Sequence, residues 1–299
     1  VIFSLAFGIF IVLFAIFFSR RLTKPLTNIV NSIDRLTEGY MDEEVSIKGF
    51  YEIEKISDSF NQMISRLQKI ENSRQEFVSN VSHELKTPIT SIKVLADSLL
   101  MQEDAPVELY REFLVDITEE IERESKIIDD LLALVKLNKT AGDMHITGVN
   151  INDLLEQILK RLQPLAKKQN IEMIYESFRP VTAEVDEVKI SLAITNLIEN
   201  AIKYNIPDGW VRVSLNADHK YFYIKVSDSG IGIPEEALDL IFERFYRVDK
   251  ARSRESGGTG LGLAITKSVI QMHHGAIKVH SVEGEGTTFN VRIPLNYIP

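Results

Sequence analysis

The chain of 299 residues contains no cysteine. This absence excludes disulfide bonds, catalysis by a thiolate and zinc sites built from cysteine, and it fits a reducing compartment. Positive charge is also scarce relative to negative charge, because 34 Lys and Arg face 43 Asp and Glu, a formal net charge of -9. A protein with this acidic balance is not expected to bind nucleic acid, which normally requires a basic face.

Charge is absent altogether from residues 1–18. As a helix this apolar run would measure about 27 Å, near the lower limit for crossing a bilayer. Arg20, Arg21 and Lys24 follow it, whereas a signal peptide carries its positive charge before the apolar run. The order favours a transmembrane helix whose basic end marks the cytoplasmic side, over the alternative of a buried core helix. We expect the chain to be the cytoplasmic part of a longer membrane protein.

Heptad patterns follow the apolar run. Leu22, Leu26 and Ile29 begin the first, which predicts a short helix, and residues 40–50 read as an extended connector. A second seam of apolar residues at alternating steps of three and four consists of Ile53, Ile56, Phe60, Met63, Leu67, Ile70, Phe77 and Val81. This pattern indicates a coiled coil or helical bundle, in which His83 points away from the seam.

A helical hairpin is predicted beyond this seam. Helical periodicity resumes at residues 92–99 after Pro88, stops near 103–106 and restarts over 109–135, with one apolar stripe per helix. Two such hairpins would close a four-helix bundle, so a homodimer is expected. Pro88 lacks a backbone donor and should weaken the helix locally, which makes it a candidate bend point beside His83.

The pattern changes after a linker at residues 139–142. Helical segments at 153–168 and 188–204 are combined with strand-like runs at 171–175, 210–215, 221–226, 276–282 and 288–293. Several of these strands are consecutive and joined by short turns, so an α+β sandwich fits better than a doubly wound sheet.

Two polar segments of this last region could carry chemistry. Asn196, Asn200 and Lys203 share one face of a predicted helix, where amide oxygens suit a hard cation and an ammonium suits phosphate. The alternative is a solvated polar face.

The second segment begins with Asp228, which follows a strand and precedes the Gly-x-Gly at 230–232. Its carboxylate could accept a hydrogen bond from an exocyclic amine, and the glycines would let a flat ring approach the backbone. An ordinary tight turn is the alternative there.

A glycine-rich run at residues 257–263 leads into an apolar helix, where backbone amides can form a phosphate cradle. It lacks the Gly-Lys-Ser/Thr ending of a Walker A loop. It also follows a charged loop, whereas a Rossmann cradle follows the first strand of a βαβ unit. We interpret the preceding loop, 244–256, as a mobile lid introduced by Phe242 and Phe245.

With His-Glu-x-x-x-Pro at residues 83–88 placed ahead of these segments, the chain resembles a membrane-bound sensor histidine kinase of a two-component system. Glu52-Ile53, at the start of the second heptad helix, resembles the acidic-apolar pair of a HAMP module. The resemblance divides the chain into a transmembrane helix (1–19), a HAMP linker (20–72), a dimerisation and phosphoacceptor hairpin (73–140) and an ATP-binding domain of the GHKL type (141–299).

The resemblance also implies a binding site for ATP and Mg²⁺. Asn200 would ligate the metal with help from Asn196, Lys203 would contact phosphate, and Asp228 would hold the adenine amino group. The other nucleotide-binding residues that it implies are Tyr204, Gly230, Gly232, Phe245, Gly258, Gly260, Leu261 and Gly262.

The reaction that the resemblance implies is attack of His83 on the γ-phosphate, with Glu84 as the proton acceptor, followed by transfer to an aspartate of a response regulator. Thr87 could position a water for the reverse task of dephosphorylating that regulator, or could serve only in local hydrogen bonding. A nucleotide-binding scaffold without phosphotransfer and a GHKL hydrolase stay open as alternatives. Asn196 stands where such hydrolases usually carry a catalytic glutamate.

Overall fold

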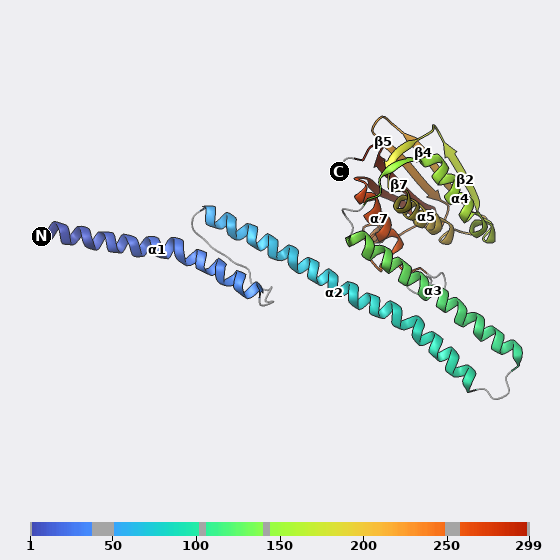
Figure 1. Cartoon of the computed structure of the whole chain (residues 1–299), viewed down its shortest axis with the longest axis horizontal. Helices are drawn as coiled ribbons and strands as arrows, with labels where there is room; N and C mark the ends of the chain where they lie inside the picture. The colour runs from blue at the N-terminus through green and yellow to red at the C-terminus, as the bar shows by residue number, and fades with distance from the viewer. Residues whose placement is uncertain (1, 38–50, 102–105, 140–143, 249–257, 298–299) are drawn as a thin grey trace. The chain divides into compact units, whose positions relative to one another are not determined.

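The computed structural model describes residues 2–37, 51–101, 106–139, 144–248 and 258–297 (Figure 1). It divides into two compact units, Val1–Val81 and Ser82–Pro299, and the boundary between them lies inside the long helix α2 (Tyr51–Leu100).

The first unit contains helix α1 (Ile2–Thr37) and the beginning of α2. The sequence predicted a membrane helix and a separate short helix, but α1 continues from one to the other through Pro25. A proline removes only one backbone hydrogen bond, and the apolar periodicity on both sides of it supports the helix. The predicted connector at 40–50 lies outside the described residues.

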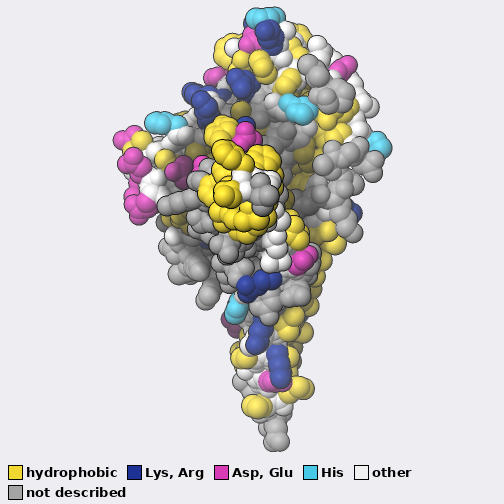
Figure 2. Space-filling model, turned by 90° about the vertical axis from the view of Figure 1, so that its left-hand side faces the viewer, with side chains coloured by type: hydrophobic (Ala, Val, Ile, Leu, Met, Phe, Trp, Pro, Cys, Tyr) yellow, Lys and Arg dark blue, Asp and Glu magenta, His cyan; other side chains and the backbone are white. Residues whose placement is uncertain are grey.

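Residues Ile2–Ser19 of α1 are long and apolar enough to cross a membrane, with a mean hydropathy of 2.7 and no residue buried. Figure 2 shows their hydrophobic side chains gathered at the end of α1 that faces the viewer. Farther along the same unit, Ile29 of α1 is buried in one cluster with Phe60 and Ile64 of α2. Part of the predicted heptad seam therefore packs α2 against α1.

The second unit begins with the predicted helical hairpin. Helix α2 runs through Pro88 to Leu100, and α3 (Val107–Lys139) forms the second helix. Pro88 is buried inside α2, and because it has no N–H it cannot donate to the carbonyl of Glu84 one turn earlier. The hairpin prediction is confirmed, whereas the role of Pro88 as a bend point stays a prediction.

The rest of the second unit is an α+β sandwich, as predicted. Its elements are β1 (Thr147–Asn150), α4 (Ile151–Lys168), β2 (Glu172–Ser177), β3 (Thr182–Val185), α5 (Glu187–Lys203), β4 (Trp210–Ala217), β5 (Tyr221–Asp228), the 3₁₀ turn η1 (Glu235–Ala237), α7 (Gly262–Met272), β6 (Ala276–Val282) and β7 (Gly286–Pro294). The five-stranded sheet has the order β2-β4-β5-β7-β6, with β2 and β4 parallel and the other neighbours antiparallel. Strands β1 and β3, which the sequence did not reveal, form a separate antiparallel pair.

One face of the large sheet is covered by α4, α5 and α7 (Figure 1). Alternate residues of β4 and β5 point into this layer, so that Val213, Phe222 and Ile224 are at most 1% exposed. From the helix side, Ile194 and Leu197 of α5 are fully buried. This shared core fixes α5 against the sheet, and with it the polar residues that α5 carries on its other face.

Candidate functional site

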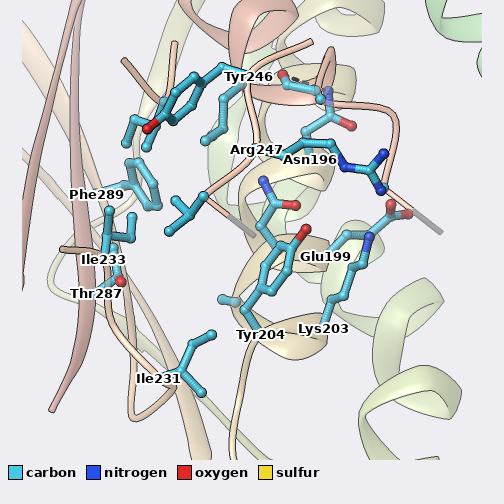
Figure 3. Close-up of a pocket in the computed structure, with 18 of the residues that line it drawn as sticks. Asn196, Glu199, Lys203, Tyr204, Ile231, Ile233, Tyr246, Arg247, Thr287 and Phe289 are labelled. Atoms are coloured by element: carbon cyan, nitrogen blue, oxygen red, sulfur yellow. Dashed lines mark hydrogen bonds between the residues drawn. The ribbon is translucent and has the colours of Figure 1, made fainter. Parts of the chain in front are cut away.

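A cavity of about 410 Å³ lies between α5, the turn after β5, the glycine-rich segment before α7, and β7 (Figure 3). Its size is typical of small-molecule sites. Helix α3 of the hairpin adds Lys126 and Asp130 to the lining. The cavity therefore has walls from both the sandwich and the hairpin.

Helix α5 presents the predicted polar face to this cavity. Asn196, Asn200, Lys203 and Tyr204 all line it, and Figure 3 shows Lys203 and Tyr204 extending from α5 into the cavity. The Asn196 side chain donates to the carbonyl of Gly262 at 3.2 Å, which ties α5 to the first turn of α7. These residues therefore share one wall of the cavity.

Burial, with the positive charges of Lys126 and Arg247, lowers the pKa of the Lys203 ammonium to about 8, while Glu199 opposes the shift. The Lys203 Nζ also lies 5.1 Å from the centre of the Tyr204 ring. A partly desolvated cation among other cations is a strong attractor for an anionic ligand.

Asp228 closes the other end of the cavity. Its Oδ1 accepts from the backbone N–H of Gly230 at 2.9 Å and of Thr287 at 3.1 Å. Burial raises the pKa of this carboxyl to about 6, although the two backbone hydrogen bonds act in the opposite direction. Because both amides bind Oδ1, the second oxygen is placed to accept a hydrogen bond from a ligand.

The turn after Asp228 needs glycine for two different reasons. Gly232 lines the cavity with a φ of +71°, and a Cβ there would lie 2.1 Å from the carbonyl oxygen of Val282. Gly230 is not among the lining residues, but a Cβ on it would meet the carbonyl oxygen of Tyr204 at 2.4 Å. Gly230 therefore shapes the wall from behind and Gly232 forms part of its surface.

In the glycine-rich segment, Gly258, Gly260 and Gly262 line the cavity. Gly260 has a φ of +71°, and its carbonyl accepts from the Phe245 N–H at 2.9 Å. Phe245 and the fully buried Leu261 are not among the lining residues, so they support the segment from outside the cavity. Residues 249–256 of the predicted lid lie outside the described residues.

The predicted phosphoacceptor, His83, is exposed on α2 and does not line the cavity. Its neighbour Glu84 is closer to the site, because Oε2 of Glu84 lies 3.6 Å from Nη1 of Arg247, a residue of the cavity wall. The Thr87 hydroxyl donates to the carbonyl of His83 at 3.1 Å, which is the local hydrogen bond expected as the alternative to a catalytic role. The hairpin thus meets the cavity one residue from His83.

Sequence reasoning missed several lining residues, among them Lys126, Asp130, Glu199, Arg247 and Phe289. Glu199 lies inside the segment already recognised on α5, and Phe289 could have been found from the alternating pattern of β7. The two α3 residues carry no such signal, because nothing local distinguishes them from other charges on a helix surface.

Comparison with known families agrees with this architecture. Residues 17–69 match the HAMP domain, and 73–140 match the His Kinase A (phospho-acceptor) domain. Residues 185–297 match the family of histidine kinase-, DNA gyrase B- and HSP90-like ATPases. The chain belongs to the two-component sensor histidine kinases.

Among curated relatives, this sensor kinase is 38% identical over 234 residues to the sensor histidine kinase WalK of Bacillus subtilis. It is 40% identical over 235 residues to the sensor protein kinase WalK of Staphylococcus saprophyticus. Each alignment covers 77% of this chain and 38% of the relative, so the chain spans well under half the length of these proteins.

Two solved structures resemble this sensor kinase over most of its length. The histidine kinase ThkA, in complex with the response regulator protein TrrA, gives a TM-score of 0.61 at 24% identity and covers 77% of this chain and 66% of ThkA. Full-length ShkA in complex with AMPPNP gives a TM-score of 0.56 at 25% identity, covering 75% of this chain and 46% of ShkA.

Proposed function

We propose that this sensor kinase is an ATP-dependent protein-histidine kinase that phosphorylates His83 and then passes the phosphoryl group to an aspartate of a response regulator. The observation that carries the proposal is the ion pair between Arg247 and Glu84, at 3.6 Å. It connects a cavity fitted for a nucleotide to the residue that follows His83, within one compact unit.

The adenine end of the cavity would be formed by Asp228, whose second carboxylate oxygen would accept a hydrogen bond from the exocyclic amine. Ile231, Ile233 and Phe289 line the cavity and give the apolar surface that a flat ring requires (Figure 3). The structure of ShkA with AMPPNP, an ATP analogue, supports adenine nucleotide as the ligand.

The phosphate end would be formed by Lys203 together with the backbone of the glycine segment. A Cβ added to Gly258 would lie 2.7 Å from the Lys203 Nζ, so glycine leaves the space in which the ammonium sits. The segment also leads into the N-terminus of α7, where backbone N–H groups and the helix dipole favour anions.

Mg²⁺ fits this site if the nucleotide supplies most of its ligands. Among the described residues, no group of three or more His, Asp or Glu could hold a metal ion by itself. Asn200 lines the cavity, and its amide oxygen is the hard ligand that we assign to Mg²⁺, with Asn196 beside it. When bound, Mg²⁺ would neutralise part of the phosphate charge.

In the first transfer, the lone pair of one imidazole nitrogen of His83 would attack the γ-phosphorus. The bond from that phosphorus to the bridging oxygen would break, and ADP would leave with the electron pair. Glu84 would accept the proton from the other ring nitrogen. To do so, its carboxylate would have to leave Arg247 and turn to the imidazole. Lys203 would offset the charge on the phosphates.

In the second transfer, an aspartate oxygen of the regulator would attack the phosphorus as its bond to the histidine nitrogen breaks. The proton then returns to the imidazole. A solved structure of similar fold holds the histidine kinase ThkA in complex with the response regulator protein TrrA, and we propose the same class of partner here. Thr87 is our candidate for positioning a water in the reverse dephosphorylation.

We further propose the domain limits given above, namely a transmembrane helix at 1–19, a HAMP linker at 20–72, the hairpin at 73–140 and the ATP-binding domain at 141–299. The HAMP and phosphoacceptor matches support a homodimer. The apolar helix Ile2–Ser19 supports an anchor in the cell membrane with the catalytic part in the cytoplasm.

The proposal is tested by incubating the purified chain in detergent with Mg²⁺ and γ-labelled ATP. We expect a label on the protein that is labile in acid and stable in base, and that moves to the aspartate of an added regulator. Binding of ATP without any label would support a scaffold. Steady release of phosphate without a labelled protein would support a hydrolase, and either result would refute the kinase assignment.

A further inference from the structure

Helix α3 contributes a polar wall to the nucleotide cavity through two residues one turn apart, Lys126 and Asp130. The Lys126 Nζ lies 3.2 Å from Oε2 of Glu199 on α5. The Thr259 hydroxyl donates to Oδ2 of Asp130 at 2.7 Å, beside the glycines that line the cavity. These two contacts hold the hairpin against the region where phosphates would bind.

Several charged side chains act on Lys203 at this wall. Lys126, Arg123 and Arg247 each act on Lys203 with positive charge, and Glu199 is the carboxylate that acts on it in the opposite sense. Figure 3 shows Lys203, Glu199 and Arg247 converging on one side of the cavity, away from Ile233 and Phe289. Arg247 is also paired with Glu84, and Arg123 with Glu120, so an anion would compete with these carboxylates for the cations. A cluster of cationic side chains beside a cavity is typical of a site for a multiply charged anion.

Asp130 is a second carboxylate on the same wall, and its orientation is fixed by Thr259. Burial raises the pKa of this carboxyl, while its hydrogen bond with Thr259 and the charge of Lys126 oppose the shift. Lys126 differs from Asp130 in its charge and in its exposure. Its side chain is 57% exposed and forms an ion pair with the carboxylate of Glu199. A long, exposed ammonium can move from Glu199 to a phosphate at little cost.

We infer that Lys126 of the phosphoacceptor hairpin contacts the phosphates of the bound nucleotide, so that the hairpin and the ATP-binding domain share the phosphate end of the site. This inference rests on the proposed function. Lys126 is then a positioning residue, because its ammonium would hold the nucleotide and the hairpin in one arrangement. In the absence of nucleotide, the ammonium pairs with Glu199 instead.

The test is the affinity of the full chain for ATP and for adenosine, measured by calorimetry at one salt concentration. Lys126→Gln should weaken ATP binding by about 3- to 10-fold, the range for one partly exposed charge-assisted contact. Binding of adenosine, which has no phosphate, should not change. Lys126→Arg should restore most of the ATP affinity.

The matched control is Lys136→Gln, which removes a lysine of the same helix that does not line the cavity. It should bind both ligands as the wild type does. Unchanged ATP affinity in Lys126→Gln would overturn the inference, and so would equal weakening of ATP and adenosine, which would indicate only damage to the fold. If the wild type bound no ATP, the proposed function itself would fail.

A second readout needs no nucleotide. Because Lys126 lowers the pKa of Lys203, its removal should raise that pKa above the value of about 8 in the wild type. NMR titration of the ¹³C-methylated lysines measures this, with Lys203→Arg identifying the resonance. An unchanged Lys203 pKa in Lys126→Gln would show that the two ammonium groups do not share one site in solution.

Discussion

The sandwich and the hairpin of the second unit bury their apolar residues to very different extents. In the sandwich, Ile194 and Leu197 of α5 are fully buried within a single chain. In the hairpin, Ile121 and Ile128 of the predicted α3 stripe are 50% and 44% exposed. The sandwich therefore has a complete core of its own, whereas the hairpin has an apolar face that a second chain would cover in the proposed homodimer.

The strongest way to test this difference is to damage the core of the sandwich. Leu197→Ala should lower the free energy of unfolding by about 2–5 kcal/mol, because it leaves a cavity among fully buried side chains. Trp210 of β4 is the single tryptophan, so its fluorescence reports unfolding of this domain. Leu165→Ala is the control, since that side chain on α4 is 39% exposed and should cost much less. A similar loss in both variants would contradict the assignment of the core.

The second test places a charge on the exposed stripe of the hairpin. Ile121→Glu should raise the dissociation constant of the dimer by roughly 30-fold or more, as expected for a residue at the centre of an interface. Sedimentation equilibrium in detergent measures this, and Trp210 unfolding should stay unchanged. Glu119→Gln is the control. It removes a charge two residues earlier, on the opposite side of α3, and should leave the dimer intact. An intact dimer in Ile121→Glu would show that this face has another role.

The third test asks whether the adenine end belongs to the sandwich alone. Since Asp228 has a pKa of about 6, affinity for adenosine should fall as the pH drops below 6, where the ionised carboxylate is lost. Asp228→Asn should weaken binding by roughly 10-fold and remove this pH dependence. Inosine lacks the exocyclic amine and should show a smaller pH effect. Ile121→Glu should show the same pH dependence of adenosine binding, because the hairpin does not form this end of the cavity. If that pH dependence were lost together with the dimer, the adenine end would not belong to the sandwich alone.

The fourth and smallest effect concerns His273, a buried residue at the end of α7. Its Nε2 accepts from the Asp186 N–H at 3.0 Å and its Nδ1 lies 2.8 Å from the Val269 carbonyl, so the neutral ring ties α7 to the start of α5. Burial lowers its pKa, so the unfolded chain binds the proton more readily and stability should fall as the pH drops below about 6.5. The expected contribution is about 1 kcal/mol.

The raised pKa of Asp228 acts in the opposite direction, because its protonated form is favoured in the folded state. The difference between wild type and His273→Gln isolates the histidine. In Trp210 unfolding from pH 7.5 to 5, that difference should shrink as the pH falls. A constant difference would mean that His273 is not held neutral.

Local patterns in the sequence predicted much of this architecture. Periodicity located the hairpin and the five strands of the large sheet, and the spacing of Asn196, Asn200 and Lys203 placed them on one face of α5. Periodicity did not reveal β1 and β3, because four-residue strands show too little alternation to be recognised.

The joining of hairpin and sandwich could not be predicted from local patterns. Thr259 and Asp130 are 129 positions apart, and Lys126 and Glu199 are 73 apart. Contacts of this kind depend on how the helices and strands pack against one another, and neither residue spacing nor composition predicts that packing. The inferred contribution of α3 to the phosphate end of the site therefore required the structure.

The central claim is that the cavity of the sandwich serves His83 of the hairpin. It is tested most directly by labelling His83→Gln with γ-labelled ATP while measuring its affinity for ATP. We predict unchanged nucleotide affinity and complete loss of the acid-labile label, with normal labelling of the control His145→Gln, which alters another exposed histidine. Acid-labile label on His83→Gln would contradict the account, because the cavity would then serve a different acceptor.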